Sequence, residues 1–398
     1  MSQPVSASRI AVEPIPLNVP EIQGNEWHYV KACLDTGWVS SVGSFVDRFE
    51  KDLASRVAAQ FAVATTNGTS ALHVALLVAG IRPGDEVLVP SMTFIAPANA
   101  IRYAGAFPVF VDAEKDYWQM SPDCIEGFLA DRCQRRDDKL YNIESGRPVT
   151  AIMPVHILGH PVDLDPILEL AKRYGLKCIE DASEALGTYY KGRPIGSHSE
   201  LACFSFNGNK IATTGGGGVL VTGNAELAQR AKYLTTQAKD DPLEFVHGEI
   251  GYNYRLTNVL AAIGCAQLEQ LDGFIARKRA IAEQYSAALT SCDGIAPMVE
   301  APWARSTFWQ YTVLVDEESF GLSSRDVISA LARREIQSRP LWQPMHLSKP
   351  HRQASSDPLP VAEMLYSRGL SLPCSSGLSP SGQDRVIEAL FDIQRRGS

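Results

Sequence analysis

The chain has 398 residues, of which 45% are hydrophobic and 21% charged, and its formal net charge is -8. This composition is typical of a soluble globular protein that is long enough for two domains. The negative charge argues against nonspecific nucleic-acid binding, which needs a basic face, so any anionic ligand must be met by a local pocket.

The N-terminal 20 residues contain four prolines and no apolar region of the signal-peptide type. They predict an extended arm that is ordered only where a partner holds it. No uninterrupted apolar stretch in the sequence reaches membrane-spanning length. The eight cysteines are scattered without a C-x-x-C pair, which fits neither a zinc site nor a disulfide framework. We therefore expect a soluble, cytoplasmic protein with reduced cysteines and no metal site.

The first predicted helix covers Glu26 to Leu34, and a loop of small residues with one tryptophan, Trp38, follows it. That tryptophan could line a pocket or an interface, or it could simply pack. A second helix is predicted over Phe45 to Ala58.

Phe61 to Thr66 is the first predicted strand, and it leads through Asn67, Gly68, Thr69 and Ser70 into a helix. A strand, a glycine turn, hydroxyls and a helix N-terminus together form a cradle for a phosphate, because free N–H groups and the helix dipole favour an anion. The same residues would also suit an ordinary helix cap.

Two more strands are predicted at Glu86 to Pro90 and Phe107 to Val111, separated by a helix. Phe94 follows the first of them, at the edge of the sheet where open α/β sheets bind ligands. It could stack on a planar cofactor ring or belong to the core. Residues 133–149 form a polar insertion to which we assign no chemistry. His156 and His160 do not share a helical face, because Gly159 and Pro161 disfavour a helix there, so they predict no metal site.

Lys177 to Asp181 is a predicted strand that ends in two carboxylates, Glu180 and Asp181. Adjacent residues of a strand point to opposite faces, so only one of the two can face a site, and Asp181 is the better candidate. An aspartate in this position could instead cap the next turn.

An apolar run from Leu201 to Phe206 predicts a buried strand that leads to a turn with one lysine, Lys210. Four glycines, Gly215 to Gly218, follow, and they imply backbone that passes where side chains do not fit or that adopts positive φ. Burial beside a sheet disfavours the ammonium form of a lysine, which suits a Schiff-base role. A solvated lysine before a flexible turn remains the alternative.

Alternating strands and helices over residues 60–240 predict a mostly parallel sheet covered on both faces. Two long helices are expected from about Thr257 to Leu271 and from Asp272 to Leu289. The pattern then changes to a strand from Gln310 to Val315, a helix from Arg325 to Arg334, a short strand near Ile336 and two further helices. This change predicts a smaller α+β domain at the C-terminus.

An anion cradle, an aromatic and an aspartate at strand ends, and a lysine before a glycine run are together the parts that hold pyridoxal phosphate (PLP). From about Pro16 to Leu390 the chain resembles the DegT/DnrJ/EryC1/StrS family of sugar aminotransferases. The resemblance rests on NGTSALHVAL (Asn67 to Leu76), GDEVLVPSMTFIAPANAI (Gly84 to Ile101), EDASEALG (Glu180 to Gly187), SFNGNK with TTGGGG (Ser205 to Gly218) and GYNYRLTNVLAAIGCAQLE (Gly251 to Glu269).

Many family members carry a histidine where this chain has Asn207 and a glutamate where it has Gly216. The sequence is most similar to the branch that aminates UDP-linked 4-keto-6-deoxy-N-acetylhexosamines for bacillosamine- and legionaminic-acid-type sugars. The segment LDTGWVSSVGSFVDRFE, from Leu34 to Glu50, supports the same branch.

The resemblance implies the fold-type I aspartate-aminotransferase architecture, an α/β class with a large, mostly parallel sheet domain and a smaller C-terminal α+β domain. The implied division is an arm at residues 1–20, a large PLP-binding domain at 21–255 and a smaller domain at 256–398. It also implies a homodimer with shared active sites and L-glutamate as the amino donor. The implied acceptor is a nucleotide-linked keto-deoxy sugar that is aminated at C4 for surface glycan synthesis.

The resemblance makes Lys210 the Schiff-base lysine and Asp181 the partner of the pyridine nitrogen. The implied cofactor-binding residues are Gly68, Thr69, Ser70, Phe94, Asp181, Glu184, Ser205 and Lys210, with Asn253 and Arg255 contributed by the second subunit. His346 and Trp38 are the candidates for the sugar pocket, and a structural role for His346 is the alternative.

Other activities remain open at this point. A PLP-dependent transaminase or dehydratase could act on a 3-keto sugar or a cyclitol, although related dehydratases replace the lysine with histidine. A noncatalytic PLP-binding regulator would keep the same cofactor residues. A nucleotide-binding dehydrogenase is disfavoured, because the glycines do not form G-x-G-x-x-G before a helix.

Overall fold

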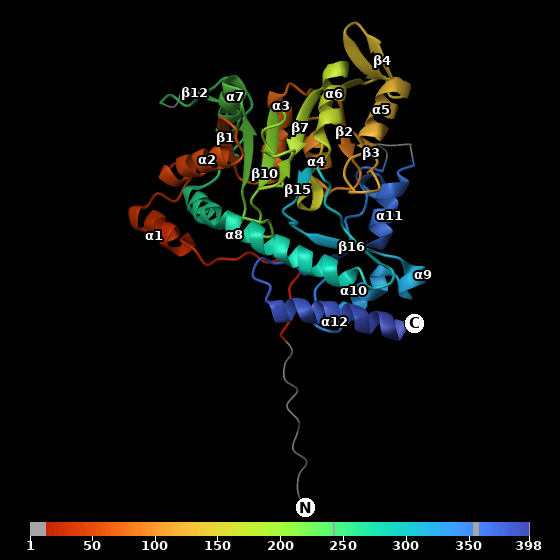
Figure 1. Cartoon of the computed structure of the whole chain (residues 1–398). Helices are drawn as coiled ribbons and strands as arrows, with labels where there is room; N and C mark the ends of the chain where they lie inside the picture. Colours follow the sequence, from red (N-terminus) through yellow and green to blue (C-terminus); the bar gives the residue numbers. More distant parts are fainter. Residues whose placement is uncertain (1–12, 242, 353–357, 398) are drawn as a thin grey trace, which may run out of the picture.

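The computed structural model describes residues 13–241, 243–352 and 358–397. A large α/β part and a smaller α+β part lie on either side of one long helix, α8 (Asn258–Leu289) (Figure 1). The predicted fold class is confirmed.

The large part is built on one mixed sheet in which seven strands follow the order β1-β11-β10-β7-β6-β2-β3. Neighbouring strands from β10 to β3 are parallel, whereas β11 runs antiparallel to both β1 and β10. The strands are β1 (Phe61–Thr65), β2 (Glu86–Pro90), β3 (Phe107–Val111), β6 (Pro148–Ile152), β7 (Lys177–Asp181), β10 (Leu201–Ser205) and β11 (Gly218–Thr222).

Both faces of this sheet are covered, because its strands are apolar on both sides. On β2, Val87 and Val89 pack into one core cluster, while Leu88 packs into the cluster on the other face. The first face carries α3 (Gly68–Val78), α4 (Ala96–Tyr103) and α7 (Ala225–Thr235). The second carries α2 (Ser44–Arg56), α5 (Pro122–Asp131), α6 (Leu164–Tyr174) and the first half of α8.

The two long helices expected at residues 257–289 are one continuous helix, so that prediction was wrong. The expected break lies at Asp272 and Gly273, but Leu271, Phe274 and Ile275 on either side are all buried in one core cluster. Packing of these residues outweighs the roughly 1 kcal/mol that a glycine costs in a helix. By length and composition α8 could cross a membrane, but 56% of its apolar window is buried against the rest of the chain.

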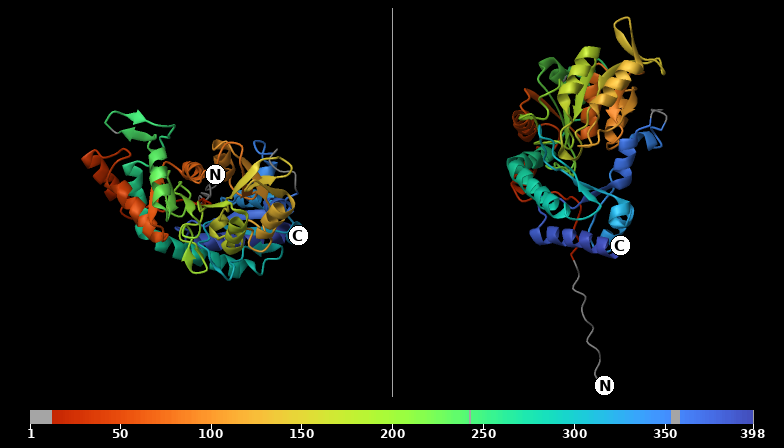
Figure 2. Two further views of the ribbon diagram at one scale, coloured as in Figure 1. Left: turned by 90° about the horizontal axis from the view of Figure 1, so that it is seen from above. Right: turned by 45° about the vertical axis from the view of Figure 1, so that its right-hand side comes forward.

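Within the described residues, the smaller part contains a three-stranded antiparallel sheet and four helices, with α12 farthest from the large sheet (Figure 2). These elements are β14 (Ile295–Pro297), β16 (Tyr311–Val315), β17 (Gly369–Leu372), α9 (Glu317–Phe320), α10 (Ser324–Ala332), α11 (Pro360–Arg368) and α12 (Pro380–Gly397). One core cluster extends from the large sheet into this part, so no break in packing separates the two at α8. The division at residue 255 stays a prediction.

The described end of the predicted arm, residues 13–20, is extended and is held by the smaller part. Ile15 forms a bridge with Ile336, and the N–H of Cys374 donates to the carbonyl of Leu17 at 3.0 Å. The strand expected near Ile336 is only this bridge. Residues 1–12 of the arm lie outside the described residues.

The remaining elements are a helix, a hairpin and several short strands and turns. Helix α1 (Glu26–Thr36) packs on α8, and the polar insertion at 133–149 contains a hairpin of β4 (Cys133–Arg136) and β5 (Lys139–Asn142) that extends from β6. Short pairs complete the structure: β8 (Tyr189–Tyr190) with β9 (Arg193–Pro194) and β15 (Ala304–Arg305), and β12 (Lys239–Asp241) with β13 (Val246–His247). Two short 3₁₀ turns cover Ile157–Gly159 and Met345–Leu347.

Candidate active site

The predicted site residues converge because several strands end at the same edge of the large sheet. Strands β1, β7 and β10 run in the same direction, so Thr65, Asp181 and Ser205 all lie at their carboxyl ends. Strand β11 runs the opposite way and begins at this edge with Gly218. Chain segments that are more than 100 residues apart in sequence therefore meet here.

The predicted phosphate cradle is a helix N-terminus lined by hydroxyls. The Asn67 side chain caps α3 by accepting a hydrogen bond from the N–H of Ser70 at 2.8 Å. Helix geometry leaves the N–H groups of Gly68 and Thr69 without an intrahelical partner, so they are available to a ligand. A Cβ at Gly68 would lie 3.2 Å from the Ser205 hydroxyl and 3.4 Å from that of Ser183. Ser183 was not among the predicted residues.

The glycine run allows the backbone to close behind this cradle. A Cβ at Gly218 would lie 2.3 Å from both the carbonyl carbon and oxygen of Asn67, and one at Gly217 would lie 2.3 Å from the Thr214 hydroxyl. Gly215 has a φ of 81°, where side chains are strained. At Gly216, by contrast, a Cβ would meet nothing within 4 Å. Gly215, Gly217 and Gly218 therefore occupy positions where a side chain would clash or be strained, whereas Gly216 does not.

Asp181 and Glu180 point to opposite faces of β7. The Asp181 carboxylate accepts a hydrogen bond from the Ser183 N–H at 3.0 Å, and burial raises the pKa of this carboxyl although that bond and the charge of Lys210 act against it. Glu180 is also buried, but hydrogen bonds from His156 and Ser199 outweigh the effect of burial and lower its pKa. The protein therefore stabilises the negative charge of Asp181 less than it stabilises that of Glu180.

Lys210 reaches into the site from the turn after β10, where its side chain is only 13% exposed. Its Nζ donates to Oε1 of Glu184 at 3.3 Å, and Oε2 of Glu184 accepts from the N–H of Leu158 at 2.9 Å. Leu158 has a φ of 61° in the turn before Gly159, and that left-handed conformation directs its N–H to the carboxylate. Burial raises the pKa of Glu184, although the Lys210 charge opposes the change.

Trp309 also belongs to this site, although no sequence pattern pointed to it. Its ring centroid lies 4.2 Å from Lys210 Nζ, and its indole N–H donates to the carbonyl of Asn209 at 2.8 Å. It lies in the segment between β15 and β16, about 100 residues beyond the lysine, and no local pattern marks it.

Three other predicted residues, Phe94, Trp38 and His346, come from other segments of the chain. Phe94 and Trp38 are 55% and 57% exposed in the single chain. His346 lies 2.7 Å through Nδ1 from the Ser91 hydroxyl at the end of β2, and 3.1 Å through Nε2 from Glu363. Both ring nitrogens of His346 therefore have protein partners in the single chain.

Asn253 and Arg255 lie on a stretch of backbone beside the end of β1, where Arg255 forms a bridge with Thr65. Tyr252 and Tyr254 stack on each other at 5.0 Å, with His73 against their edges. Because side chains alternate along extended backbone, Asn253 and Arg255 face the other way. Asn253 is exposed, and the Nε of Arg255 is buried without a hydrogen-bond partner.

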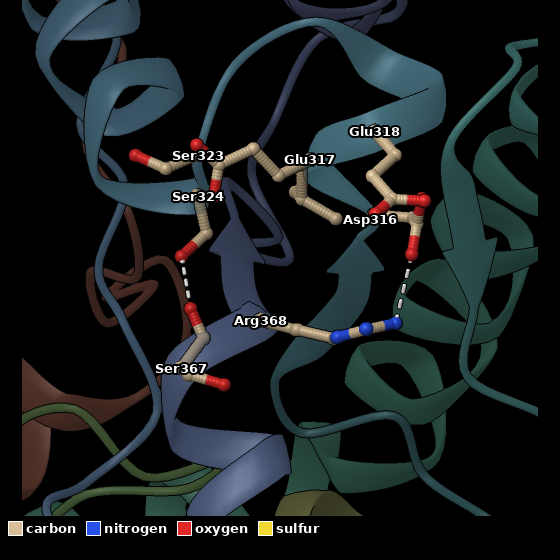
Figure 3. A pocket seen from close by; sticks show the side chains of 8 residues that line it. Asp316, Glu317, Glu318, Ser323, Ser324, Ser367 and Arg368 are labelled. Carbon is tan, nitrogen blue, oxygen red and sulfur yellow. Dashed lines mark hydrogen bonds and ion pairs between the residues drawn. The ribbon is translucent and has the colours of Figure 1, made fainter.

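A separate cavity of about 540 Å³ lies on the smaller part and contains none of these residues (Figure 3). Carboxylates and hydroxyls surround it, and Arg368 crosses it to pair with Asp316 at 2.9 Å. The residues that line it include no lysine, cysteine or histidine and no buried polar group without a partner, so we assign the chemistry to the sheet edge.

The donor set at the sheet edge fits PLP. The cradle at Gly68 offers N–H groups and hydroxyls for a phosphate, Lys210 offers a buried amine, and Asp181 offers a buried carboxyl that a cationic ring nitrogen would compensate. Among the described residues, no group of His, Cys, Asp or Glu side chains could hold a metal ion.

Comparisons with known proteins show what the chain is similar to. The sequence model of the DegT/DnrJ/EryC1/StrS aminotransferase family matches residues 20–391. The chain is 42% identical to GDP-perosamine synthase of Caulobacter vibrioides, over 95% of this chain and 98% of that protein. It is 39% identical to EpsN of Bacillus subtilis, a putative pyridoxal phosphate-dependent aminotransferase, with 95% of each chain covered. The solved structure of the aminotransferase TlmJ from Streptoalloteichus hindustanus superposes with a TM-score of 0.87 at 28% identity, covering 97% of this chain and 100% of that one.

Proposed function

The chain belongs to the DegT/DnrJ/EryC1/StrS aminotransferase family and is a PLP-dependent sugar aminotransferase, and from this premise we propose its substrates. We propose that it transfers the amino group of L-glutamate to the C4 keto carbon of a nucleotide-linked keto-deoxy sugar. The product would be an amino sugar for a surface glycan.

One observation carries the assignment of the residues. Lys210 is a nearly buried amine, 3.3 Å from a buried carboxylate, at the same sheet edge as Asp181 and the N-terminus of α3. An amine in this position would hold the aldehyde group of a cofactor whose phosphate the helix binds. The same placement lets it reach a proton beside the cofactor ring.

Each residue has a proposed task. The N–H groups of Gly68 and Thr69 and the hydroxyl of Ser205 bind the phosphate, with Ser70 shaping the first turn of the helix. Phe94 covers one face of the ring. Glu184 holds the Lys210 amine near the edge of the cofactor.

Proton positions follow from the same geometry. PLP, when bound, supplies an electron sink for the negative charge left when a proton leaves the α-carbon of the donor. Asp181 would keep a proton on the pyridine nitrogen, and Lys210 Nζ would take the α-proton and deliver it to the cofactor. Both steps run in reverse when the keto sugar is aminated, which predicts ping-pong kinetics.

For the nucleotide we favour GDP, because the relative at 42% identity is named GDP-perosamine synthase. A UDP-linked N-acetylated keto sugar is the second candidate, supported by the segments Leu34 to Glu50 and Ser205 to Gly218. Trp38 and His346 remain our candidates for the sugar side of the site, with His346 acting through its contact with Ser91.

We further propose a homodimer with shared sites. Phe94 and Asn253 are exposed in the single chain although both would serve the cofactor, so a second copy would complete the site with its Asn253 and Arg255. We also place the enzyme in the cytoplasm, in keeping with its eight free cysteines.

The test is an acceptor panel. The purified protein with PLP and L-glutamate is incubated with GDP-, UDP- and dTDP-linked 4-keto-deoxy sugars, and the amino sugar and 2-oxoglutarate are measured. We expect the highest kcat/KM for a GDP-linked sugar and no turnover for Lys210→Arg. A preference for a UDP-linked N-acetylated sugar would select the second candidate. No product with any acceptor, or full activity of the Lys210→Arg variant, would contradict the proposal.

A further inference from the structure

Trp309 is buried, with 5% of its surface exposed, in the core cluster of the large part. Large buried aromatics usually serve packing alone. Two further contacts distinguish this one, and both are to the turn that carries Lys210.

The first contact is between the indole face and the amine. Lys210 Nζ lies 4.2 Å from the ring centroid, well within the range of a cation–π interaction, for which tryptophan has the best ring. Glu184 Oε1 lies 3.3 Å from the same nitrogen. The ammonium is therefore held by an aromatic face and a carboxylate together.

The second contact fixes the ring relative to the lysine backbone. The indole N–H donates to the carbonyl of Asn209, the residue before Lys210, at 2.8 Å. The Asn18 amide donates to the same carbonyl at 2.9 Å. The turn that bears the lysine is thus tied to the segment before β16 and to the arm.

The backbone of Trp309 is itself held by a hydrogen bond from α8. The buried Lys278 of α8 donates to the carbonyl of Trp309 at 3.0 Å and to that of Cys374 at 2.7 Å. These bonds satisfy buried carbonyls and hold the Trp309 backbone in one place.

We propose that Trp309 is a positioning residue for Lys210: its indole face holds the free ammonium beside Glu184 and over the cofactor site. A lysine side chain loses considerable rotamer freedom when it is held in one place, and an aromatic face restricts it without consuming a donor. The inference rests on the proposed role of Lys210 as the amine that binds the cofactor.

The test follows the reaction of Lys210 with PLP in the cofactor-free protein. Borohydride traps the adduct at set times between pH 6 and pH 10, and peptide mapping identifies the labelled lysine. Trp309→Leu removes the aromatic face, so the ammonium loses a stabilising partner. We expect the midpoint of the pH–rate curve to fall by roughly 0.5 to 1.5 pH units. Trp303→Leu, the same change at a tryptophan that contacts His160 and Tyr190 instead, should leave the midpoint unchanged.

A shape-conserving series removes the risk of misfolding. Fluorinated tryptophans placed at position 309 weaken the ring face step by step, so the midpoint should fall with each added fluorine, whereas a packing role predicts no trend. An unchanged midpoint in this series and in Trp309→Leu would overturn the inference. A wild-type protein without label on Lys210 would instead refute the proposed function, so the two failures are distinguishable.

Discussion

At the scale of the residue, the site depends on which way each side chain faces. Strand alternation correctly predicted that Glu180 and Asp181 point to opposite faces of β7, because that periodicity is local. The contact of the Leu158 N–H with Glu184 was not predictable, since it needs a left-handed φ at a leucine. Trp309 was not predictable either, because only tertiary packing brings it to Lys210.

The two carboxylates of β7 give a matched pair of substitutions. Asp181→Asn should lower kcat by roughly 100-fold or more while PLP affinity changes far less, because an amide cannot keep the ring nitrogen protonated. Glu180→Gln should lower the melting temperature and leave kcat nearly unchanged, since its bonds to His156 and Ser199 are structural. Kinetics, PLP titration and thermal unfolding separate the two. Equal losses of binding and activity in Asp181→Asn would indicate a mainly structural role for Asp181.

His160 predicts a pH dependence of stability. Its ring is buried and stacked on Tyr117, Nδ1 contacts the carbonyl of Pro161 at 2.8 Å, and Nε2 accepts from the N–H of Ala301 at 3.0 Å. Burial lowers its pKa to about 4. The unfolded chain takes up this proton near pH 6.5 and the folded chain does not, so stability should fall as the pH is lowered from about 6.5 to 4.

The contribution of this histidine should reach roughly 3 kcal/mol at pH 4. Denaturant unfolding of His160→Gln should show lower stability at pH 7 but a flatter dependence in this window. His28→Gln, at an exposed position of α1, serves as the control and should keep the wild-type slope. A His160→Gln slope equal to that of the wild type would show that the ring does not titrate as proposed.

At the scale of the element, the glycine run illustrates what a pattern does and does not determine. Four consecutive glycines predicted close backbone approach or positive φ, and both occur, at Gly217 and Gly218 and at Gly215. The pattern could not show that Gly216 faces open space. It also could not show that the neighbour of Gly218 is the cap of α3, because that contact joins β1 to β11.

The difference in space around Gly218 and Gly216 predicts different outcomes for alanine substitutions at the two positions. Gly218→Ala places a methyl group against the backbone of Asn67 and Gly68, which cannot rotate away, and should cost about 1–3 kcal/mol of stability and weaken PLP binding. Gly216→Ala should leave both unchanged. Thermal unfolding and PLP titration of the two variants provide the measurement, and similar behaviour of the two would contradict the described geometry.

Most helices and long strands of the large part could be predicted because their apolar periodicity is strong. The short strands β8, β9, β14, β15 and β17 could not, since two to four residues carry little local signal. The predicted break in α8 was wrong because it relied on local signal. Asp272 and Gly273 are weak helix formers, but burial of the neighbouring apolar residues in one core keeps the helix continuous.

At the scale of the whole molecule, composition and alternation predicted an α/β fold, while the order of motifs along the chain identified the family. The continuity of one core through both parts was beyond sequence reasoning, because it depends on how α8 and the N-terminal arm pack. The same holds for the exposure of Phe94 and Asn253, which only the folded chain reveals.

The proposed shared sites predict complementation between two inactive proteins. Lys210→Ala and Asn253→Ala should each be inactive or nearly so, and mixing them after dissociation should restore about a quarter of wild-type activity, because half of the dimers then contain one intact site. Mixing Lys210→Ala with Asp181→Asn, two changes in the same half-site, is the control and should restore nothing. Absence of recovery in the first mixture would contradict a site completed by Asn253 of a second copy.

The central claim, that Lys210 is the amine to which PLP binds, is tested most directly by reducing the holoenzyme with borohydride and mapping the labelled peptide. We predict one label, on Lys210, accompanied by loss of the visible absorbance of the protein and absent from Lys210→Ala. A label on another lysine, or none on Lys210 in a protein that still transaminates, would contradict the account.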